Sequence, residues 1–201
     1  MNKQIGFTLI EISIVLVIIG LILAGLFVGG QALIANTKAS GTVKLITDLT
    51  GAVSGFKSRY HYLPGDLPKA GDDITGVGTC DIATSTAKIG NGLIDTLQEE
   101  NCAPVELVSA GFIKGSAAGM VSPLNPGSSP DVFLLARTSA AINAAVTTFP
   151  ATVQNVIEIR NIPLDAANAI DSKIDDGNLG SGNVMAASGV DSTHVTLDVG
   201  L

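Results

Sequence analysis

The residue with the largest chemical consequence is Glu11, an acid inside a long apolar run. Apolar side chains begin at Phe7, directly after Gly6, and continue to Val28 with Glu11 as the only charged residue among them. A carboxylate in a segment of lipid length costs roughly 2.5–3.5 kcal/mol near the helix centre and less toward an end. Such a group needs a partner. Cleavage after Gly6 would supply one, the cationic α-amino group of Phe7.

The two cysteines, Cys80 and Cys102, are the next residues with distinctive chemistry. They lie 22 residues apart in the polar part of the chain. An even cysteine count in an oxidising compartment predicts one disulfide, which adds about 3 kcal/mol on the chain-entropy model. Two buried or free thiols are the alternative. The spacing is not that of a Cys-x-x-Cys redox motif.

Three acids near the C-terminus, Asp171, Asp175 and Asp176, precede Gly177 and suggest a metal site. Carboxylates around a glycine-rich turn can ligate calcium through hard oxygen atoms. The spacing does not fit an EF-hand loop, so we favour a solvated turn with charges at a helix end and no cofactor, and calcium binding is the alternative. A second acidic stretch, 91–100, contains Asp95, Glu99 and Glu100 and is expected to be a solvated surface.

Signals for catalysis or nucleic-acid binding are poor. His61 and His194 are the only histidines, and they lack metal-ligand spacing. The sequence contains neither a Gly-x-Ser-x-Gly elbow nor a Gly-x-x-x-x-Gly-Lys phosphate loop. A net charge of −7 disfavours non-specific binding to nucleic acid. We therefore expect neither an enzyme nor a nucleic-acid-binding protein.

A long N-terminal helix must position Glu11. Residues 7–28 would form about 33 Å of helix, enough to span a bilayer core. An ordinary signal peptide has a shorter apolar core and a small-x-small cleavage site, which Gly29-Gly30-Gln31 does not provide. Beyond the span, apolar residues recur at three- and four-residue intervals. They are Val43, Ile46, Leu49, Val53, Phe56 and Tyr60.

This periodicity predicts one helix over residues 7–60, apolar all round in its first half and amphipathic in its second. Gly29-Gly30 and Ser40-Gly41 are positions where it could bend or unwind. Pro64-Gly65-Asp66 ends the helix in a turn. Within the apolar half, Gly20-x-x-x-Ala24 and Gly25-x-x-x-Gly29 place small residues one turn apart, which lets membrane helices approach closely. Glycine is also simply common in such helices.

The remaining residues predict an α+β domain in which antiparallel strands pack on the amphipathic helix. The expected strands are 132–136, 153–160, 184–187 and 194–199, and the last alternates with Val195, Leu197 and Val199 on one side. Short helices are expected at 104–110 and at 164–174, the latter burying Leu164, Ala167, Ile170 and Ile174. Residues 115–130, rich in Ser, Gly and Pro, are expected to form a loop.

The N-terminus resembles a known motif. The segment Gly6-Phe7-Thr8-Leu9-Ile10-Glu11, with Lys3 in the preceding leader, is similar to the prepilin cleavage and methylation motif of type IV pilins and type II secretion pseudopilins. The resemblance implies that a membrane peptidase cuts between Gly6 and Phe7 and methylates Phe7. It also implies that Glu11 guides subunits into a helical filament. The segments 61–66, 107–113 and 170–177 resemble pilin-like proteins more loosely, and some pseudopilins hold calcium in their C-terminal region.

The resemblance implies a pilin-like organisation. Residues 1–6 would be the leader, 7–29 the transmembrane and filament-core helix, 30–60 its amphipathic continuation, and 61–201 a periplasmic head. The expected partners are the prepilin peptidase and N-methyltransferase, other pilin subunits, and an inner-membrane assembly platform with its motor ATPase. The expected location is the inner membrane and then a pilus or pseudopilus of a Gram-negative bacterium.

Two other classes of protein remain open. One is a membrane-anchored periplasmic binding protein or enzyme with an uncleaved anchor. The other is a secreted protein released by an ordinary signal peptidase. The sequence does not distinguish a major from a minor subunit, nor a pilus from a secretion or DNA-uptake system.

Overall fold

The computed structural model describes residues 7–80, 89–114, 119–124, 130–137, 149–150, 152–187 and 193–201. The predicted leader, with Lys3 and Gly6, lies outside these residues, as does part of the predicted loop 115–130. The chain divides into two compact units, Met1–Thr37 and Lys38–Leu201.

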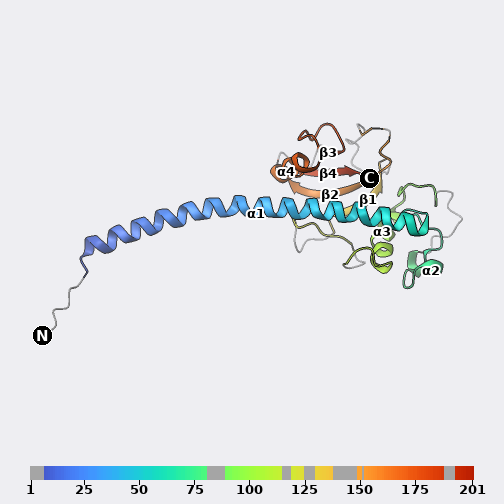
Figure 1. Cartoon of the computed structure of the whole chain (residues 1–201), viewed down its shortest axis with the longest axis horizontal. Helices are drawn as coiled ribbons and strands as arrows, with labels where there is room; N and C mark the ends of the chain where they lie inside the picture. Colours follow the sequence, from blue (N-terminus) through green and yellow to red (C-terminus); the bar gives the residue numbers. More distant parts are fainter. Residues whose placement is uncertain are drawn as a thin grey trace. The chain divides into compact units, whose positions relative to one another are not determined.

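The first long element is helix α1 (Leu9–Tyr60), which confirms the predicted N-terminal helix (Figure 1). The backbone stays α-helical at Gly29-Gly30 and at Ser40-Gly41, so neither pair unwinds it. The helix ends at Tyr60, because His61 adopts a left-handed backbone with φ of 65° and the Pro64 turn follows. Lys57 and Arg59 lie in its last turn, where positive charge complements the helix dipole.

The part of α1 in the second unit buries the predicted apolar face. Ile46, Leu49, Val53 and Phe56 are at most 5% exposed, while Val43 and Tyr60 are partly buried. The Phe56 ring lies 4.6 Å from the ring of Tyr60 and 5.8 Å from that of Phe112, measured between centroids. These side chains share one hydrophobic cluster with residues of the sheet and of the later helices, and that cluster is the core of the unit.

A four-stranded antiparallel sheet completes the predicted α+β fold, with strand order β1-β2-β4-β3 (Figure 1). The strands are β1 (Val132–Ala136), β2 (Asn155–Pro163), β3 (Val184–Ala187) and β4 (His194–Gly200). The start predicted for β2 at residue 153 was two residues early. β2 also continues past the predicted end, through a bulge between Ile159 and Ile162 where Asn161 has a positive φ.

The two faces of the sheet bury different residues. Leu134, Ile157 and Val199 are neighbours in register and belong to the core cluster. Leu135, Val156 and Met185 lie on the opposite face in a second, smaller cluster. The alternation predicted for β4 is therefore present, but its other face is buried too, and Thr196 and Asp198 lie there.

Helix α3 (Leu97–Ser109) begins seven residues before the predicted start at Pro104. Thr96 and Glu99 form a capping box: the Thr96 hydroxyl accepts the Glu99 N–H, and the Glu99 carboxylate accepts the Thr96 N–H. This cap starts the helix, and Pro104 lies inside it. Two short elements, α2 (Ala70–Asp73) and η1 (Gly78–Cys80), precede α3.

Helix α4 (Leu164–Ile174) has the predicted bounds and contacts β2, β3 and β4 (Figure 1). The predicted buried face was partly wrong. Leu164 and Ile174 are 38% and 37% exposed, whereas Ala167 and Ile170 are buried as expected. The buried face also contains Ala166 and, unexpectedly, Asp171.

Candidate functional site

Hydrogen bonds in the first turn of α1 position the carboxylate of Glu11. The backbone N–H and the hydroxyl of Thr8 both donate to Glu11 Oε2, at 2.9 and 2.7 Å. The Glu11 N–H approaches the Thr8 hydroxyl oxygen at 3.3 Å in return. This reciprocal pattern is a capping box, in which Thr8 is the cap and Glu11 the third helical residue. Phe7, directly before it, is 84% exposed.

The helix that follows Glu11 is exposed and apolar within its own chain. Leu9–Leu26 is a helical stretch that is long enough and apolar enough to cross a membrane, and none of it is buried. A Cβ added at Gly20 or Gly25 would meet no atom within 4 Å, so both glycines leave open helix surface. The surroundings of Gly29 lie outside what the structure describes. A single chain therefore leaves this surface for lipid or other helices to cover.

These features coincide with the result of the family comparison. Residues 1–27 match the family model of the prokaryotic N-terminal methylation motif. This is the N-terminal motif of type IV pilins and pseudopilins. The pilin motif implies processing by a prepilin peptidase, and proteins that carry it are typically non-enzymatic structural subunits. Comparison of the chain with curated proteins and with solved structures finds no match.

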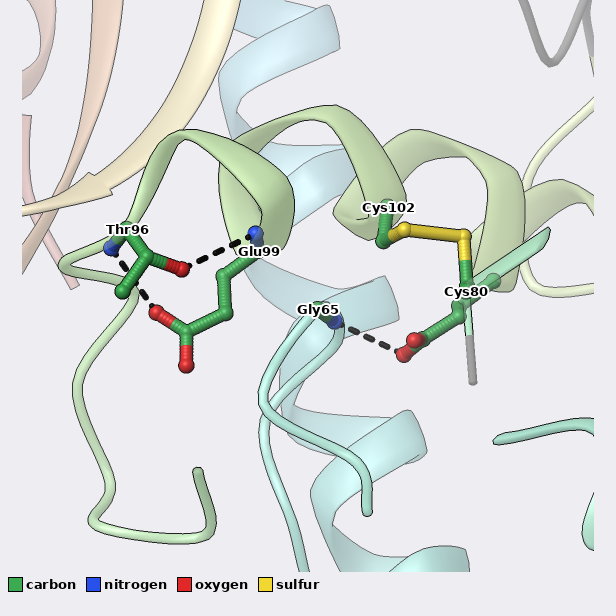
Figure 2. The surroundings of a disulfide bond; sticks show 6 residues. Gly65, Cys80, Thr96, Glu99 and Cys102 are labelled. Carbon is green, nitrogen blue, oxygen red and sulfur yellow. Dashed lines mark hydrogen bonds between the residues drawn. A yellow bond between two sulfur atoms is a disulfide. The ribbon is translucent and has the colours of Figure 1, made fainter. Parts of the chain in front are cut away.

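The predicted disulfide is present in the unit beyond the pilin motif. Cys80 of η1 and Cys102 of α3 are bonded with a Cα–Cα distance of 5.6 Å, and both are buried (Figure 2). The bond ties the segment after α2 to α3. Its presence suits an oxidising compartment.

The turn after α1 is held by buried acids that the sequence did not reveal. The Gly65 N–H donates to Glu106 Oε2 at 2.7 Å (Figure 2). Asp66 accepts the N–H groups of Gly90 and Gly92, one on each carboxylate oxygen. Asp66 and Glu106 are fully buried. The segment 61–66 thus connects α1, α3 and the 90–92 loop.

Two acids of the stretch expected to be a solvated surface are buried, whereas Asp95 is half-buried and Asn91 is exposed. Glu99 is fully buried and Glu100 is 7% exposed. Glu99 faces inward because its carboxylate accepts the N–H groups of both Asp95 and Thr96 at the start of α3. Burial raises its pKa, and the hydrogen bonds from Thr96 and Asp95 partly oppose this effect. The Thr-x-x-Glu spacing was the signal for an inward-facing acid here.

A second buried pair of acids lies on the face of the sheet opposite the core cluster. Glu158 and Asp198 are direct partners in the β2–β4 register, and both are at most 1% exposed. Arg160 forms an ion pair with Glu158, and its guanidinium lies 4.1 Å from the centroid of the Phe133 ring. Neither carboxylate oxygen of Asp198 has a hydrogen-bond partner among the described residues. Burial, and then the charge of Glu158, raises the pKa of Asp198 to about 8.

The predicted metal ligands do come together. Asp171, Asp175 and Asp176 each offer one carboxylate oxygen, and these oxygens lie within 4.8 Å of one another. Asp175 accepts the N–H groups of Asn183 and Val184, and Asp176 accepts the N–H of Asn178, so both order the 177–184 loop.

Asp171 differs from the other two acids of this group in its burial. It is fully buried, and neither of its carboxylate oxygens has a hydrogen-bond partner in the part of the chain that the structure describes. Burial, and then the charges of Asp175 and Asp176, raises its pKa, and the nearby backbone N–H of Gly177 partly opposes this shift. The simple solvated turn is therefore wrong for Asp171, and the oxygen donor set fits a hard cation such as calcium.

Proposed function

We propose that the chain is a structural filament subunit, a pilin or pseudopilin, cleaved after Gly6 and assembled through α1. The observation that carries this proposal is the exposed apolar surface from Leu9 to Leu26 with a single acid, Glu11, near its start. Lipid covers such a surface in a membrane, and neighbouring helices cover it in a filament core. The same segment can therefore serve first as an anchor and then as an assembly element.

Glu11 has a specific task in this proposal. Within its own chain it pairs only with neutral donors of Thr8, as far as the described contacts go. Cleavage after Gly6 leaves a cationic amine on Phe7, and methylation preserves its charge. In the water-poor filament core, Glu11 of one subunit pairs with the Phe7 amine of the next. Removing one member of such a buried pair typically costs about 3–5 kcal/mol, so the pair fixes the axial stagger between subunits.

The partners follow from the same proposal. A prepilin peptidase and N-methyltransferase processes the leader, and the other subunits are pilins of the same or a related kind. An inner-membrane platform and its motor ATPase extract the subunits, since the sequence contains no phosphate-binding loop of its own. The head faces the periplasm of a Gram-negative cell, where the Cys80–Cys102 disulfide is stable.

Replacing Glu11 tests the assembly role. Glu11→Gln keeps the size and the hydrogen-bonding capacity of the side chain but removes its charge. We expect normal cleavage after Gly6 and a loss of at least about tenfold in the subunit recovered in sheared filaments, as a lost pair of this kind requires. Ser13→Ala is the matched control, because the Ser13 hydroxyl bonds only to the Ile10 carbonyl of its own helix among the described contacts. Filaments of Glu11→Gln at wild-type levels would refute the role.

An apolar groove in the second unit supports one alternative. The groove has a volume of about 770 Å³, and Leu45, Leu49, Phe112 and Met120 contribute to its lining. A cavity of this size could hold a small apolar ligand. The chain would then be a membrane-anchored periplasmic binding protein, or an enzyme, with an uncleaved anchor. A mature chain that still begins at Met1 would favour this alternative.

We also propose that Asp171, Asp175 and Asp176 bind calcium. The three carboxylates converge, and Asp171 is buried with both oxygens available. Calcium would supply the positive charge that compensates three adjacent acids. Bound there, it would fix the end of α4 against the 177–184 loop.

A further inference from the structure

Three buried carboxyl groups converge where the turn after α1 meets α3. We name Gly65, Asp66, Glu99 and Glu106 the acid clasp. The clasp is tightly closed: a Cβ on Gly65 would lie 2.2 Å from the carbonyl oxygen of Glu99. All three acids are fully buried. Figure 2 shows Gly65 and Glu99 of the clasp together with the Cys80–Cys102 disulfide, which bonds η1 to α3.

The hydrogen bonds of the clasp leave two carboxylate oxygens unsatisfied. Glu106 uses Oε2 to accept the Gly65 N–H, and Glu99 uses Oε2 to accept the Asp95 and Thr96 N–H groups. The remaining Oε1 atoms of Glu99 and Glu106 are buried without a hydrogen-bond partner among the described residues. An ionised carboxylate in that position loses its hydration without full compensation.

Among the described residues, the charges that act on Glu106 are all negative. Asp66 comes from the turn after α1, and Glu99 comes from α3 itself. The charge of Asp95, in the segment before α3, acts on Asp66, whereas the Asp95 backbone N–H donates a hydrogen bond to Glu99. Two other elements that contact α3, η1 (Gly78–Cys80) and β1 (Val132–Ala136), contain no charged residue. Ionisation of Glu106 would therefore add a further anion to a buried acidic cluster.

We propose that the acid clasp is a proton-dependent lock, closed while Glu106 carries a proton and loosened when that proton is lost. Neutral Glu106 keeps Oε2 as the acceptor of the Gly65 N–H and removes the repulsion from Asp66 and Glu99. Loss of the proton favours a state in which the turn lifts from α3 and water reaches the carboxylate. The disulfide still holds η1 to α3, so the opening is confined to the turn.

The direction of the pH dependence follows from Glu106. Burial, and then the charges of Asp66 and Glu99, raises its pKa from 4.5 to about 8, while the Gly65 hydrogen bond opposes the shift. A group with a raised pKa in the closed state stabilises that state fully at low pH. The stabilisation is lost as the pH rises from the open-state pKa toward the closed-state pKa. The clasp is therefore tight in mild acid and looser near pH 8.

Hydrogen exchange on the full chain in detergent micelles tests this inference. The protection of the backbone amides of residues 61–69 against hydrogen exchange should fall at least about tenfold between about pH 5.5 and about pH 7.5, after correction for intrinsic exchange rates. Glu106→Gln, which retains an acceptor for Gly65, should abolish that fall. Asp72→Asn, which removes an exposed acid from the adjacent helix α2, should leave it unchanged.

Three results would overturn the lock. The first is wild-type protection that does not change with pH. The second is the same fall in Glu106→Gln as in the wild type. The third needs no variant: a peptide from β2 in the same wild-type sample that loses protection as much as the segment 61–69 would show global rather than local opening.

Discussion

Replacing Gly65 by alanine tests the close approach between the turn and α3. Gly65 has φ of +88°, and an added Cβ would lie 2.2 Å from the Glu99 carbonyl oxygen and 3.2 Å from the Ala103 Cβ. A left-handed backbone costs a residue with a Cβ about 1–2 kcal/mol. The clash is with helix backbone, which cannot yield cheaply, and overpacking of this kind adds about 1–3 kcal/mol. We expect Gly65→Ala to lower the free energy of unfolding by about 2–5 kcal/mol.

Gly76→Ala is the matched control for this substitution. Gly76 has φ of +90°, and an added Cβ would meet nothing within 4 Å. Gly76→Ala should therefore lower the free energy of unfolding only by the cost of the left-handed backbone, about 1–2 kcal/mol. Denaturant unfolding followed by tyrosine fluorescence suits the comparison, because the two tyrosines, Tyr60 and Tyr62, both lie just before the turn and the chain has no tryptophan. Equal costs for the two substitutions would refute the close packing of the turn on α3.

Three further substitutions give separate predictions. Asp198→Asn should stabilise the chain at pH 8 by up to about 5 kcal/mol and change its stability little near pH 4, because the raised pKa of Asp198 makes wild-type stability decline between these pH values. Thermal melts at several pH values measure this difference. A variant that is less stable than the wild type at pH 8 would contradict the prediction. Cys102→Ser should cost roughly 3 kcal/mol by denaturant unfolding, and a reducing agent should then have no further effect on the variant. Calcium at about 100 times its dissociation constant should stabilise the wild type by about 2.7 kcal/mol, and Asp171→Asn should remove most of that stabilisation. If removing calcium with a chelator leaves the wild-type melting temperature unchanged, the site is excluded.

The sequence predicted well those elements whose signal is local. The bounds of β1 and α4 were predicted to the residue, and the buried face of α1 followed from its periodicity. Such patterns work because one face of an element must be apolar when it packs on a core. The start of α3 was wrong because Pro104 looked like a first helical residue, although Thr96 and Glu99 carried the capping signal.

The buried acids could not be predicted, because charged residues are almost never fully buried unless they are paired. Asp198 is buried because both faces of the sheet are covered. Its position opposite Glu158 depends on the strand register, which the sequence does not show. Asp66 and Glu106 lie 40 residues apart in the sequence and meet only through the turn after α1. The disulfide was predictable from the cysteine count, whereas its neighbourhood of acids was not.

The N-terminal residue of the mature chain is the most direct test of the filament proposal. Intact-mass and N-terminal fragment analysis of the protein isolated from filaments should show a chain that begins at Phe7 and carries a methyl group on its α-amino nitrogen. That amine is the partner required by Glu11. A functional, filament-incorporated chain that still begins at Met1 would contradict the proposal, because no cationic amine would then lie beside the first turn of α1.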